Sequence, residues 1–373
     1  MILAYDSTYH GTNREPKVTM SSNAAAPLLD HTPATCQGEG DLDRLPPDKQ
    51  VWDRKKTAAV VVAGVYAQAE DSHLRKHGWN CDRCSEHLIL QTLVNPASGE
   101  EGRKVKSWKC RERHCPICQS ARANKLHREF AAVLPDIEKQ VKGGVFLFLT
   151  LSVRNCPLTE LRATLTSMNR AWQRLTQQPE FKIVKGWIRG TEVTRGAWVD
   201  KRTGSPIDKR DLDKVPRKYR ELKDPTLAHP HFHVLLLVPP SYFGKSYIKQ
   251  AQWVELWKKA AQLDYMPTGV DIRRVKTAKG GIVEAVKAAT YSIKAADIET
   301  DPAWFLEFHR QVCSLRFLAT GGIIKKALKG KVEGLADDIA EGKEPEPESV
   351  VIAEKVFDFN RPKSFYLRRK REV

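Results

Sequence analysis

Hydrophobic and polar residues follow two periods along the central part of the chain, and these periods predict its helices and strands. Five stretches carry apolar residues three and four positions apart, which is the spacing of one helix face. Four shorter runs are rich in β-branched and aromatic residues, which is typical of strands. The predicted helices cover about 54–75, 120–134, 159–175, 246–263 and 281–297, and the predicted strands cover 145–153, 185–195, 231–238 and 269–277.

The order of these elements predicts the fold class. From residue 145 onward the predicted order is strand, helix, strand, strand, helix, strand, helix. Such an order favours a mixed, mainly antiparallel sheet with helices packed over it. The predicted fold class is therefore α+β, with a central sheet and flanking helices, preceded by a cysteine-rich module.

Both ends of the chain lack this periodicity. The first residues are rich in Ser, Thr, Pro, Gly and Asn, and the last are acidic and then basic, so neither end is expected to fold. A charged stretch with Pro and Gly, 200–226, is interpreted as an exposed insertion. The predicted divisions are a disordered tail (1–48), a helical and zinc-binding cysteine-rich module (49–130), a sheet domain (131–300), a C-terminal helical extension (301–335) and a flexible tail (336–373).

The charge of the chain narrows its classes of partner. It has 62 Lys and Arg against 45 Asp and Glu, a formal net charge of +17, which favours a polyanion such as nucleic acid. No apolar run approaches the roughly 20 residues of a membrane span. The longest candidate, 57–66, lies too far from Met1 for a signal peptide. We expect a cytoplasmic protein that binds nucleic acid and no membrane.

Five of the eight cysteines lie within 38 residues. Cys81 and Cys84 form one C-x-x-C pair, and Cys115 and Cys118 form another. Without a secretion signal, this spacing favours a tetrahedral Zn²⁺ site over disulfides. Cys110 is a reserve ligand that could replace one of the four or serve a second site. The alternative is a set of structural cysteines without a metal.

Basic residues and one more candidate ligand surround the cysteines. His114 is a second reserve ligand for zinc, because it lies next to Cys115. Arg111, Arg113 and Arg122 are candidates to contact DNA phosphates, since a cationic surface neutralises the phosphate backbone.

Three histidines gather at the start of the predicted strand 231–238. Residues two apart on a strand face the same side, so His231 and His233 converge. Two imidazoles suit a divalent metal, and Glu192 is the candidate third ligand because an isolated carboxylate within a strand is costly unless it is paired. His229 ranks below Glu192, since Pro230 separates it from the strand. The alternative is two partly exposed histidines without a ligand.

The predicted helix 281–297 carries a tyrosine away from its apolar stripe. Tyr291 shares the opposite stripe with Glu284, Lys287 and Lys294. A tyrosine with cationic neighbours suits phosphate chemistry, because ammonium groups favour the phenolate and hold an anionic substrate. The alternative is a solvated helix face covered by an amphipathic tyrosine.

Together these stretches resemble the replication initiator (Rep) proteins of rolling-circle plasmids, a branch of the HUH endonuclease superfamily. The specific part is an H-x-H strand followed by a Tyr-x-x-Lys helix, and the cysteine segment favours the plasmid branch. The matching stretches run in the family's order: 110–125, 146–153, 187–194, 229–238, 270–276 and 291–299.

The resemblance implies a fold, two cofactors and a reaction. It implies a sheet of the HUH type, with Mg²⁺ or Mn²⁺ held by His231, His233 and Glu192, and Zn²⁺ at the cysteine cluster. Tyr291 would attack the scissile phosphate and form a 5′-phosphotyrosyl link, releasing a 3′-hydroxyl, while Lys294 would neutralise developing charge. The implied partners are single-stranded or hairpin plasmid origin DNA, with a host helicase and replication machinery in the bacterial cytoplasm.

One position departs from the family's pattern. Where the plasmid branch has a glutamate four residues before the tyrosine, this chain has Lys287. Glu284 lies seven before Tyr291 on the same stripe and is the candidate to activate water at termination, either from this greater distance or because residues 288–290 are an insertion that re-registers the motif. Lys287 is then a candidate DNA contact.

Two other function classes explain part of the sequence. A zinc-containing DNA-binding regulator that never cuts would account for the charge and the cysteines, but not for the histidines, Glu192 and Tyr291 together. A conjugative relaxase or a single-strand transposase would use the same catalytic residues, but the cysteine segment argues against both. A zinc module that binds RNA explains less.

Overall fold

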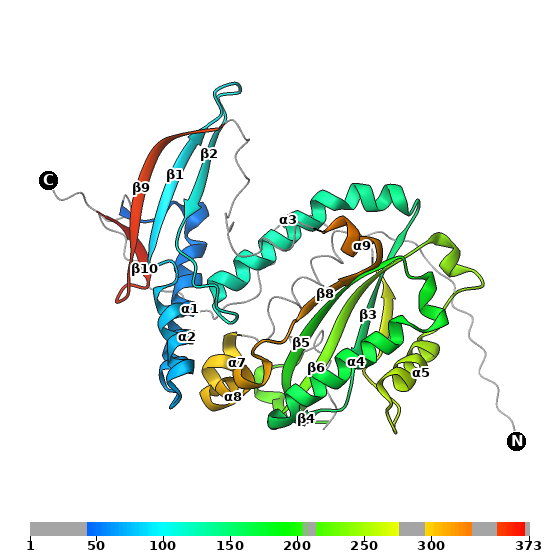
Figure 1. The fold of residues 1–373 in the computed structure, drawn as a ribbon. Helices are drawn as coiled ribbons and strands as arrows, with labels where there is room; N and C mark the ends of the chain where they lie inside the picture. The colour runs from blue at the N-terminus through cyan, green and yellow to red at the C-terminus, as the bar shows by residue number, and fades with distance from the viewer. Residues whose placement is uncertain (1–42, 204–206, 208–213, 276–294, 330–348, 370–373) are drawn as a thin grey trace, which may run out of the picture. The chain divides into compact units, whose positions relative to one another are not determined.

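The computed structural model describes residues 43–203, 207, 214–275, 295–329 and 349–369, which form two antiparallel sheets with helices (Figure 1). The α+β prediction is confirmed. The helices are α1 (Val51–Ala67), α2 (Ser72–Arg83), α3 (Pro116–Gln140), α4 (Leu161–Thr176), α5 (Gln250–Ala261), α7 (Ala295–Thr300), α8 (Pro302–Val312) and α9 (Gly322–Ala327). The strands are β1 (His87–Val94), β2 (Glu101–Lys106), β3 (Val145–Ser152), β4 (Cys156–Pro157), β5 (Gly186–Asp200), β6 (Arg220–Val238), β7 (Asp271–Arg274), β8 (Leu318–Gly321), β9 (Val350–Asn360) and β10 (Phe365–Arg368).

The larger sheet has six strands in the order β7-β3-β6-β5-β8, and β4 pairs with β6 off this path. Its central strands β3 and β6 are the two apolar runs of the sequence, and both faces of such a run must be covered. Side chains of β3 alternate between two cores: Phe146 and Phe148 enter one, and Leu147 and Leu149 enter the other.

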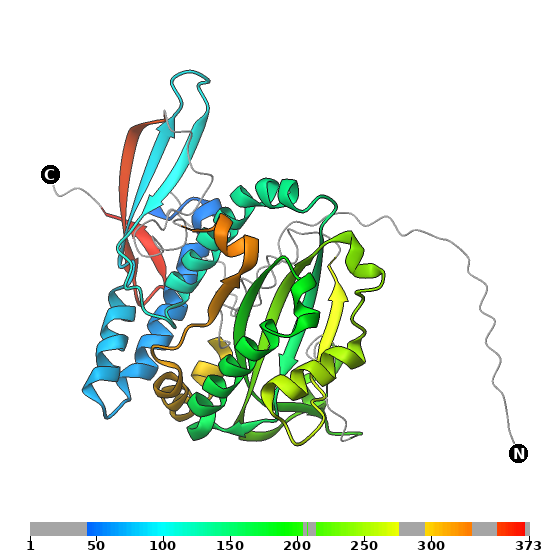
Figure 2. The ribbon, with the colours of Figure 1, turned by 45° about the vertical axis from the view of Figure 1, so that its right-hand side comes forward.

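Helices cover the two faces of this sheet (Figures 1 and 2). α4 and α5 lie over one face, where Trp172, Trp253 and Trp257 are buried in one core. α3 and α9 cover the other face with Phe130 and Ile324, among others. The histidines of β6 lie on the α3 side, in the same alternating row as Leu235 and Leu237.

The smaller sheet joins the two ends of the described chain. Its order is β10-β9-β1-β2, and the register pairs His87 with Asp358. The prediction of a flexible tail at 336–373 is therefore wrong for residues 349–369, which contain β9 and β10. Phe357, Phe359 and Tyr366 enter the core, and burial of large aromatic side chains stabilises the folded state.

Two further divisions predicted from the sequence need correction. The segment 301–335 is not a separate helical extension, since β8 pairs with β5 at the edge of the larger sheet. The stretch 200–226 is not wholly an irregular insertion, because β6 begins at Arg220. Within the described residues, none of the helices is both long and apolar enough to cross a membrane.

Candidate metal-dependent active site

The two histidines and the glutamate lie on adjacent antiparallel strands. The register of β5 with β6 places Glu192 directly opposite His231, and Gly190 opposite His233. Because alternate residues of a strand share a face, the three side chains project from the same side of the sheet. Gly190 adds no side chain to this row, so the Glu192 carboxylate can reach both rings.

Three potential ligand atoms converge at this point. Glu192 Oε2 lies 3.3 Å from His231 Nε2 and 3.0 Å from His233 Nε2. All three ligand atoms lie within 4.8 Å of one another. Two imidazole nitrogens and a carboxylate oxygen are a donor set for a divalent first-row metal. The structure therefore brings together the three ligands expected from the sequence.

The remaining ring nitrogens hold the imidazoles in position. His231 Nδ1 lies 3.2 Å from the carbonyl oxygen of His229. A carbonyl only accepts hydrogen bonds, so Nδ1 carries the proton and Nε2 of the neutral ring keeps its lone pair. His233 Nδ1 lies 3.3 Å from Thr150 Oγ1, on the opposite residue of β3. Such partners orient a metal-binding histidine.

The site is largely enclosed by protein. His231 is 5% exposed, and Glu192 and His233 are partly buried. His229 lies outside the group of three ligands and places its Nδ1 2.6 Å from Asn155 Oδ1. Burial and the nearby His231 lower the pKa of His229 to about 4, so this ring is neutral at pH 7.

Cysteine thiols form a second candidate metal site. Cys84 ends α2 and Cys115 precedes α3, so two helix ends bring these thiols together. The sulfur atoms of Cys84, Cys110, Cys115 and Cys118 lie within 4.8 Å of one another. Cys118 Sγ is 3.7 Å from Cys84 Sγ and 3.6 Å from Cys110 Sγ. Four thiolates about 2.3 Å from Zn²⁺ would lie about 3.8 Å apart, which agrees with this spacing.

The set of four contains Cys110, which was expected only as a reserve, in place of Cys81. Cys81 is buried, but its sulfur lies outside the group of four. The pKa of the Cys84 thiol is lowered because the thiols of Cys110, Cys115 and Cys118 hydrogen-bond to it, and the thiolate is the form that binds metal.

His114, the other reserve ligand, is placed elsewhere. Its ring packs against those of Phe305, Phe308 and His309, and neither ring nitrogen has a hydrogen-bond partner among the residues that the structure describes. Burial, with a contribution from His309, holds its pKa well below the ordinary value. His114 is therefore a neutral core residue and not one of the group of four.

Comparison with known proteins identifies the family. A family model described as a replication protein matches residues 101–367, well over half of the chain. The chain belongs to this replication protein family. The resemblance to Rep proteins drawn from the sequence is thereby confirmed at the level of the family. The match includes β9 and most of β10, which were predicted to be part of a flexible tail.

Curated relatives are about a third identical to the chain over the aligned residues. "Protein rep" of Bacillus amyloliquefaciens is 33% identical over 236 residues, which cover 61% of this chain and 60% of the relative. "Protein rep" of Lentilactobacillus hilgardii is 32% identical over 62% of this chain and 69% of the relative. "Protein rep" of Streptococcus pneumoniae is 28% identical over 61% of this chain and 64% of the relative. These matches span about 60–69% of the relatives' length. No solved structure matches.

The tyrosine part of the family's predicted motif lies outside the described residues. This applies to Tyr291, Lys294, Glu284 and Lys287. The structure resumes with α7 at Ala295, within the helix expected there. These four residues therefore remain predictions from the sequence.

Two of the three arginines expected to contact DNA have partners inside the protein. Arg113 donates to the carbonyl of Leu315 and stacks over Phe317, 4.8 Å from the ring centroid. Arg122 donates to the carbonyls of residues 111–113. Both guanidinium groups thus brace the loop before α3, which gives them a structural role. Arg111 has a left-handed backbone (φ 63°) in that same loop.

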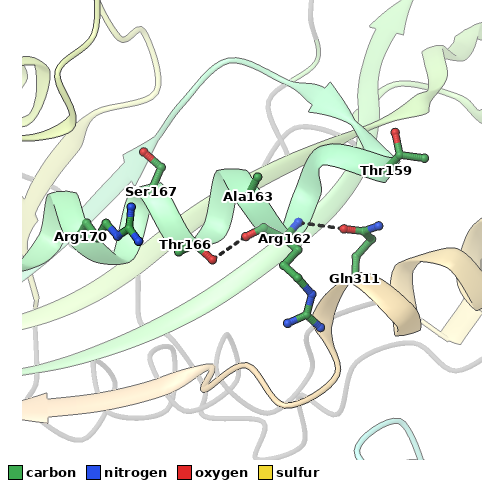
Figure 3. Close-up of a pocket in the computed structure, with 7 residues that line it drawn as sticks. All are labelled: Thr159, Arg162, Ala163, Thr166, Ser167, Arg170 and Gln311. Carbon is green, nitrogen blue, oxygen red and sulfur yellow. Dashed lines mark hydrogen bonds between the residues drawn. The ribbon is translucent and has the colours of Figure 1, made fainter.

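A surface groove on the other face of the sheet is separate from the ligands. Figure 3 shows it along α4, with Gln311 contributed by α8. The Arg162 backbone N–H donates to Gln311 Oε1, 3.1 Å away, and Arg162 also donates to the Cys313 carbonyl. The groove is the outer side of a helix whose inner side covers the sheet, so it adds nothing to the metal site.

One residue of the site was missed in the sequence. Thr150 is the residue that holds His233, and it is a polar residue in the buried strand β3. A hydroxyl inside an apolar strand needs a partner, so this position carried a signal.

Proposed function

We propose that this protein is a plasmid replication initiator that nicks one strand of its origin by a metal-dependent tyrosine transesterification and rejoins it at termination, as an endonuclease of the HUH type. The observation that supports this most directly is the convergence of His231, His233 and Glu192 at a single point. Family membership supports replication as the process.

The donor set fits a catalytic divalent cation. Both Nε2 atoms face the same carboxylate oxygen, and both Nδ1 atoms have hydrogen-bond partners that orient the rings. Three protein ligands leave coordination positions for a phosphate oxygen and water, and Mn²⁺ or Mg²⁺ is the proposed ion. When bound, the ion supplies Lewis-acid polarisation of the scissile phosphate.

The chain's own residues then have distinct roles. Glu192 and the two histidines hold the site, and Thr150 keeps the His233 ring turned toward Glu192. Tyr291 is the proposed nucleophile: its oxygen forms a bond to phosphorus as the P–O3′ bond breaks, and the leaving oxygen takes a proton to become the 3′-hydroxyl. Lys294 is proposed to stabilise the charge that develops on the phosphate.

Termination is proposed to use a carboxylate near the tyrosine. Glu284 is the candidate to accept a proton from water that cleaves the phosphotyrosyl link, because Lys287 occupies the position of the family's glutamate. Lys287 is then proposed to contact the DNA backbone.

The zinc-binding regulator remains the other function class. A regulator accounts for the thiol cluster, but it gives no reason for the carboxylate to lie between two imidazoles. For the nickase, the cysteine cluster is proposed to hold Zn²⁺ and to shape the DNA-binding region around Arg111. A host helicase and replication machinery are the further partners expected of an initiator.

A covalent adduct tests the proposed function. The protein is incubated with single-stranded DNA from the origin of its plasmid and Mn²⁺, and protein–DNA adducts are separated on a denaturing gel. Wild type should give an adduct and Tyr291→Phe none. Tyr265→Phe is the matched control, since this hydroxyl accepts a hydrogen bond from the Arg154 N–H at 2.9 Å. An adduct in Tyr291→Phe would place the nucleophile elsewhere, and no cutting by wild type would favour the regulator.

A further inference from the structure

Strands β5 and β6 continue beyond the larger sheet as a two-stranded ribbon. β3 pairs with residues 231–238 of β6, and β8 pairs with residues 187–190 of β5. Further along, residues 197–200 pair with residues 220–223, and among the described strands they pair with no other. A bulge at Gly196, whose φ is 49°, separates this part from the metal site. We call the described residues of 197–223 the ribbon.

The ribbon is held together by contacts of its own. Asp200 accepts two hydrogen bonds from the Arg202 guanidinium, at 3.0 and 2.6 Å. Arg202 also stacks on Tyr219, 4.4 Å from the ring centroid, and the Arg220 side chain donates to the Val215 carbonyl at 2.6 Å. An isolated two-stranded ribbon is marginally stable, so these contacts make it a defined element.

The outer surface of the ribbon is cationic. Its described residues include seven Lys or Arg and two Asp or Glu. Arg217, Lys218 and Lys223 are exposed, and the part of the chain that the structure describes places no carboxylate within ion-pair distance of them. Arg217 and Lys218 lie on a 3-10 turn and Lys223 lies on β6. Three exposed cations without an ion-pair partner among the described residues favour a polyanionic partner.

We propose that the ribbon binds double-stranded DNA beside the nick site, an inference that rests on the proposed function. The major groove of B-DNA admits a two-stranded ribbon, and exposed cations at its turn and edge can contact the phosphates on either side. Single-stranded DNA at the metal site and duplex DNA on the ribbon would thus be held by the same two strands, β5 and β6.

Because β6 carries both sites, it also limits the distance between the ribbon and the metal site. Lys223 precedes His231 on β6 by eight residues, which span at most about 27 Å of extended chain. That length corresponds to about eight base pairs at 3.4 Å each. The duplex DNA bound by the ribbon should therefore begin within about one helical turn of the nick.

Salt-dependent binding to a fluorescein-labelled, mixed-sequence duplex longer than two helical turns tests this proposal. The variant Arg217→Gln/Lys218→Gln/Lys223→Gln removes three charges. Its slope of log affinity against log salt should fall by about 2.7, and its affinity should drop roughly 100-fold at physiological salt. The control Lys182→Gln/Lys245→Gln/Lys259→Gln removes three exposed charges elsewhere and should bind nearly as wild type.

Nicking of single-stranded origin DNA separates this proposal from the proposed function. The ribbon variant should nick the single strand at the wild-type rate, because its substitutions lie outside the metal site. Duplex affinity equal to that of the control variant would overturn the ribbon proposal and leave an acidic protein partner as the reason for the charge. If wild type does not nick at all, the proposed function fails, and the duplex titration still decides the role of the ribbon.

Discussion

His231 and Glu192 lie directly opposite each other on β6 and β5, with Nε2 and Oε2 3.3 Å apart. Their pairing is fixed by the backbone register of two long strands and not by a loop. The carbonyl of His229, on the same strand, fixes the tautomer of the His231 ring. The site is thus preorganised by main-chain hydrogen bonds, which suits a reaction that depends on the position of a cation.

Replacing the carboxylate should remove the cation. In Glu192→Gln the neutral amide cannot supply the negative ligand, so we expect Mn²⁺ affinity and the nicking rate to fall at least about 100-fold. Titration calorimetry measures the Mn²⁺ affinity without DNA. Glu180→Gln, on the exposed turn after α4, is the control. Unchanged Mn²⁺ binding by Glu192→Gln would remove Glu192 from the ligands.

Loss of the hydroxyl behind His233 should have a smaller effect. Thr150→Val keeps the shape of the side chain but removes the partner of His233 Nδ1. Mn²⁺ affinity should fall about 10-fold, while the free energy of unfolding changes by only about 1 kcal/mol. Thr166→Val is the matched control. It makes the same substitution on the far side of the sheet, where the Thr166 hydroxyl donates to the Arg162 carbonyl. Equal Mn²⁺ affinities in both variants would show that Thr150 does not position His233.

The central sheet and its ligands could be predicted because their signals are local. The runs that became β3 and β6 are apolar, and the two-residue period alone places His231 and His233 on one face. The ligand on the partner strand was harder to predict, but an isolated carboxylate within a strand-like run indicated Glu192. The helix expected at 281–297 still awaits a test, since most of it lies outside the described residues.

The C-terminal strands could not be predicted because their partner is distant in the chain. His87 on β1 pairs with Asp358 on β9, and no local period reveals such a pairing. The membership of the cysteine cluster was hard to predict for a different reason. Spacing showed that thiols gather, but the loop between β2 and α3, with its left-handed Arg111, decides which four lie within reach of one ion.

Zinc content should distinguish Cys110 from Cys81. Because Cys110 belongs to the group of four thiols, Cys110→Ala should lose the bound Zn²⁺, whereas Cys81→Ala should keep it. Atomic absorption on dialysed protein gives the stoichiometry, and circular dichroism shows whether each variant is folded. Cys313→Ala, at an exposed cysteine, is the control. Retention of zinc by Cys110→Ala with loss by Cys81→Ala would restore the two C-x-x-C pairs as the ligands.

The C-terminal strands should be needed for stability. Tyr366 is fully buried, its hydroxyl donates to the Ser85 carbonyl at 2.5 Å, and its N–H donates to Asp53. Tyr366→Phe leaves that buried carbonyl without this donor, so urea denaturation should show a loss of about 1–3 kcal/mol in the free energy of unfolding. Tyr247→Phe, at a half-exposed ring, should show almost none. Equal stability of the two variants would contradict the role of β10 in this core.

Acid should destabilise the fold through His309. Its ring is 5% exposed and its Nδ1 lies 2.7 Å from the Tyr66 hydroxyl, which donates to the neutral ring. Burial, with contributions from His77 and Arg113, lowers its pKa to about 4, below the unfolded value of about 6.5. The unfolded state therefore binds more protons between these values, and stability contributed by the neutral ring is lost as pH falls through this window.

The measurement compares wild type with His309→Phe by urea denaturation at pH 7 and pH 4.5. Wild type should lose about 2 kcal/mol more than the variant between these values, because only wild type has this ring to protonate. The constant cost of leaving the Tyr66 hydroxyl without its acceptor cancels in the comparison of slopes. Parallel pH profiles for wild type and His309→Phe would mean that His309 is not held neutral in the folded protein.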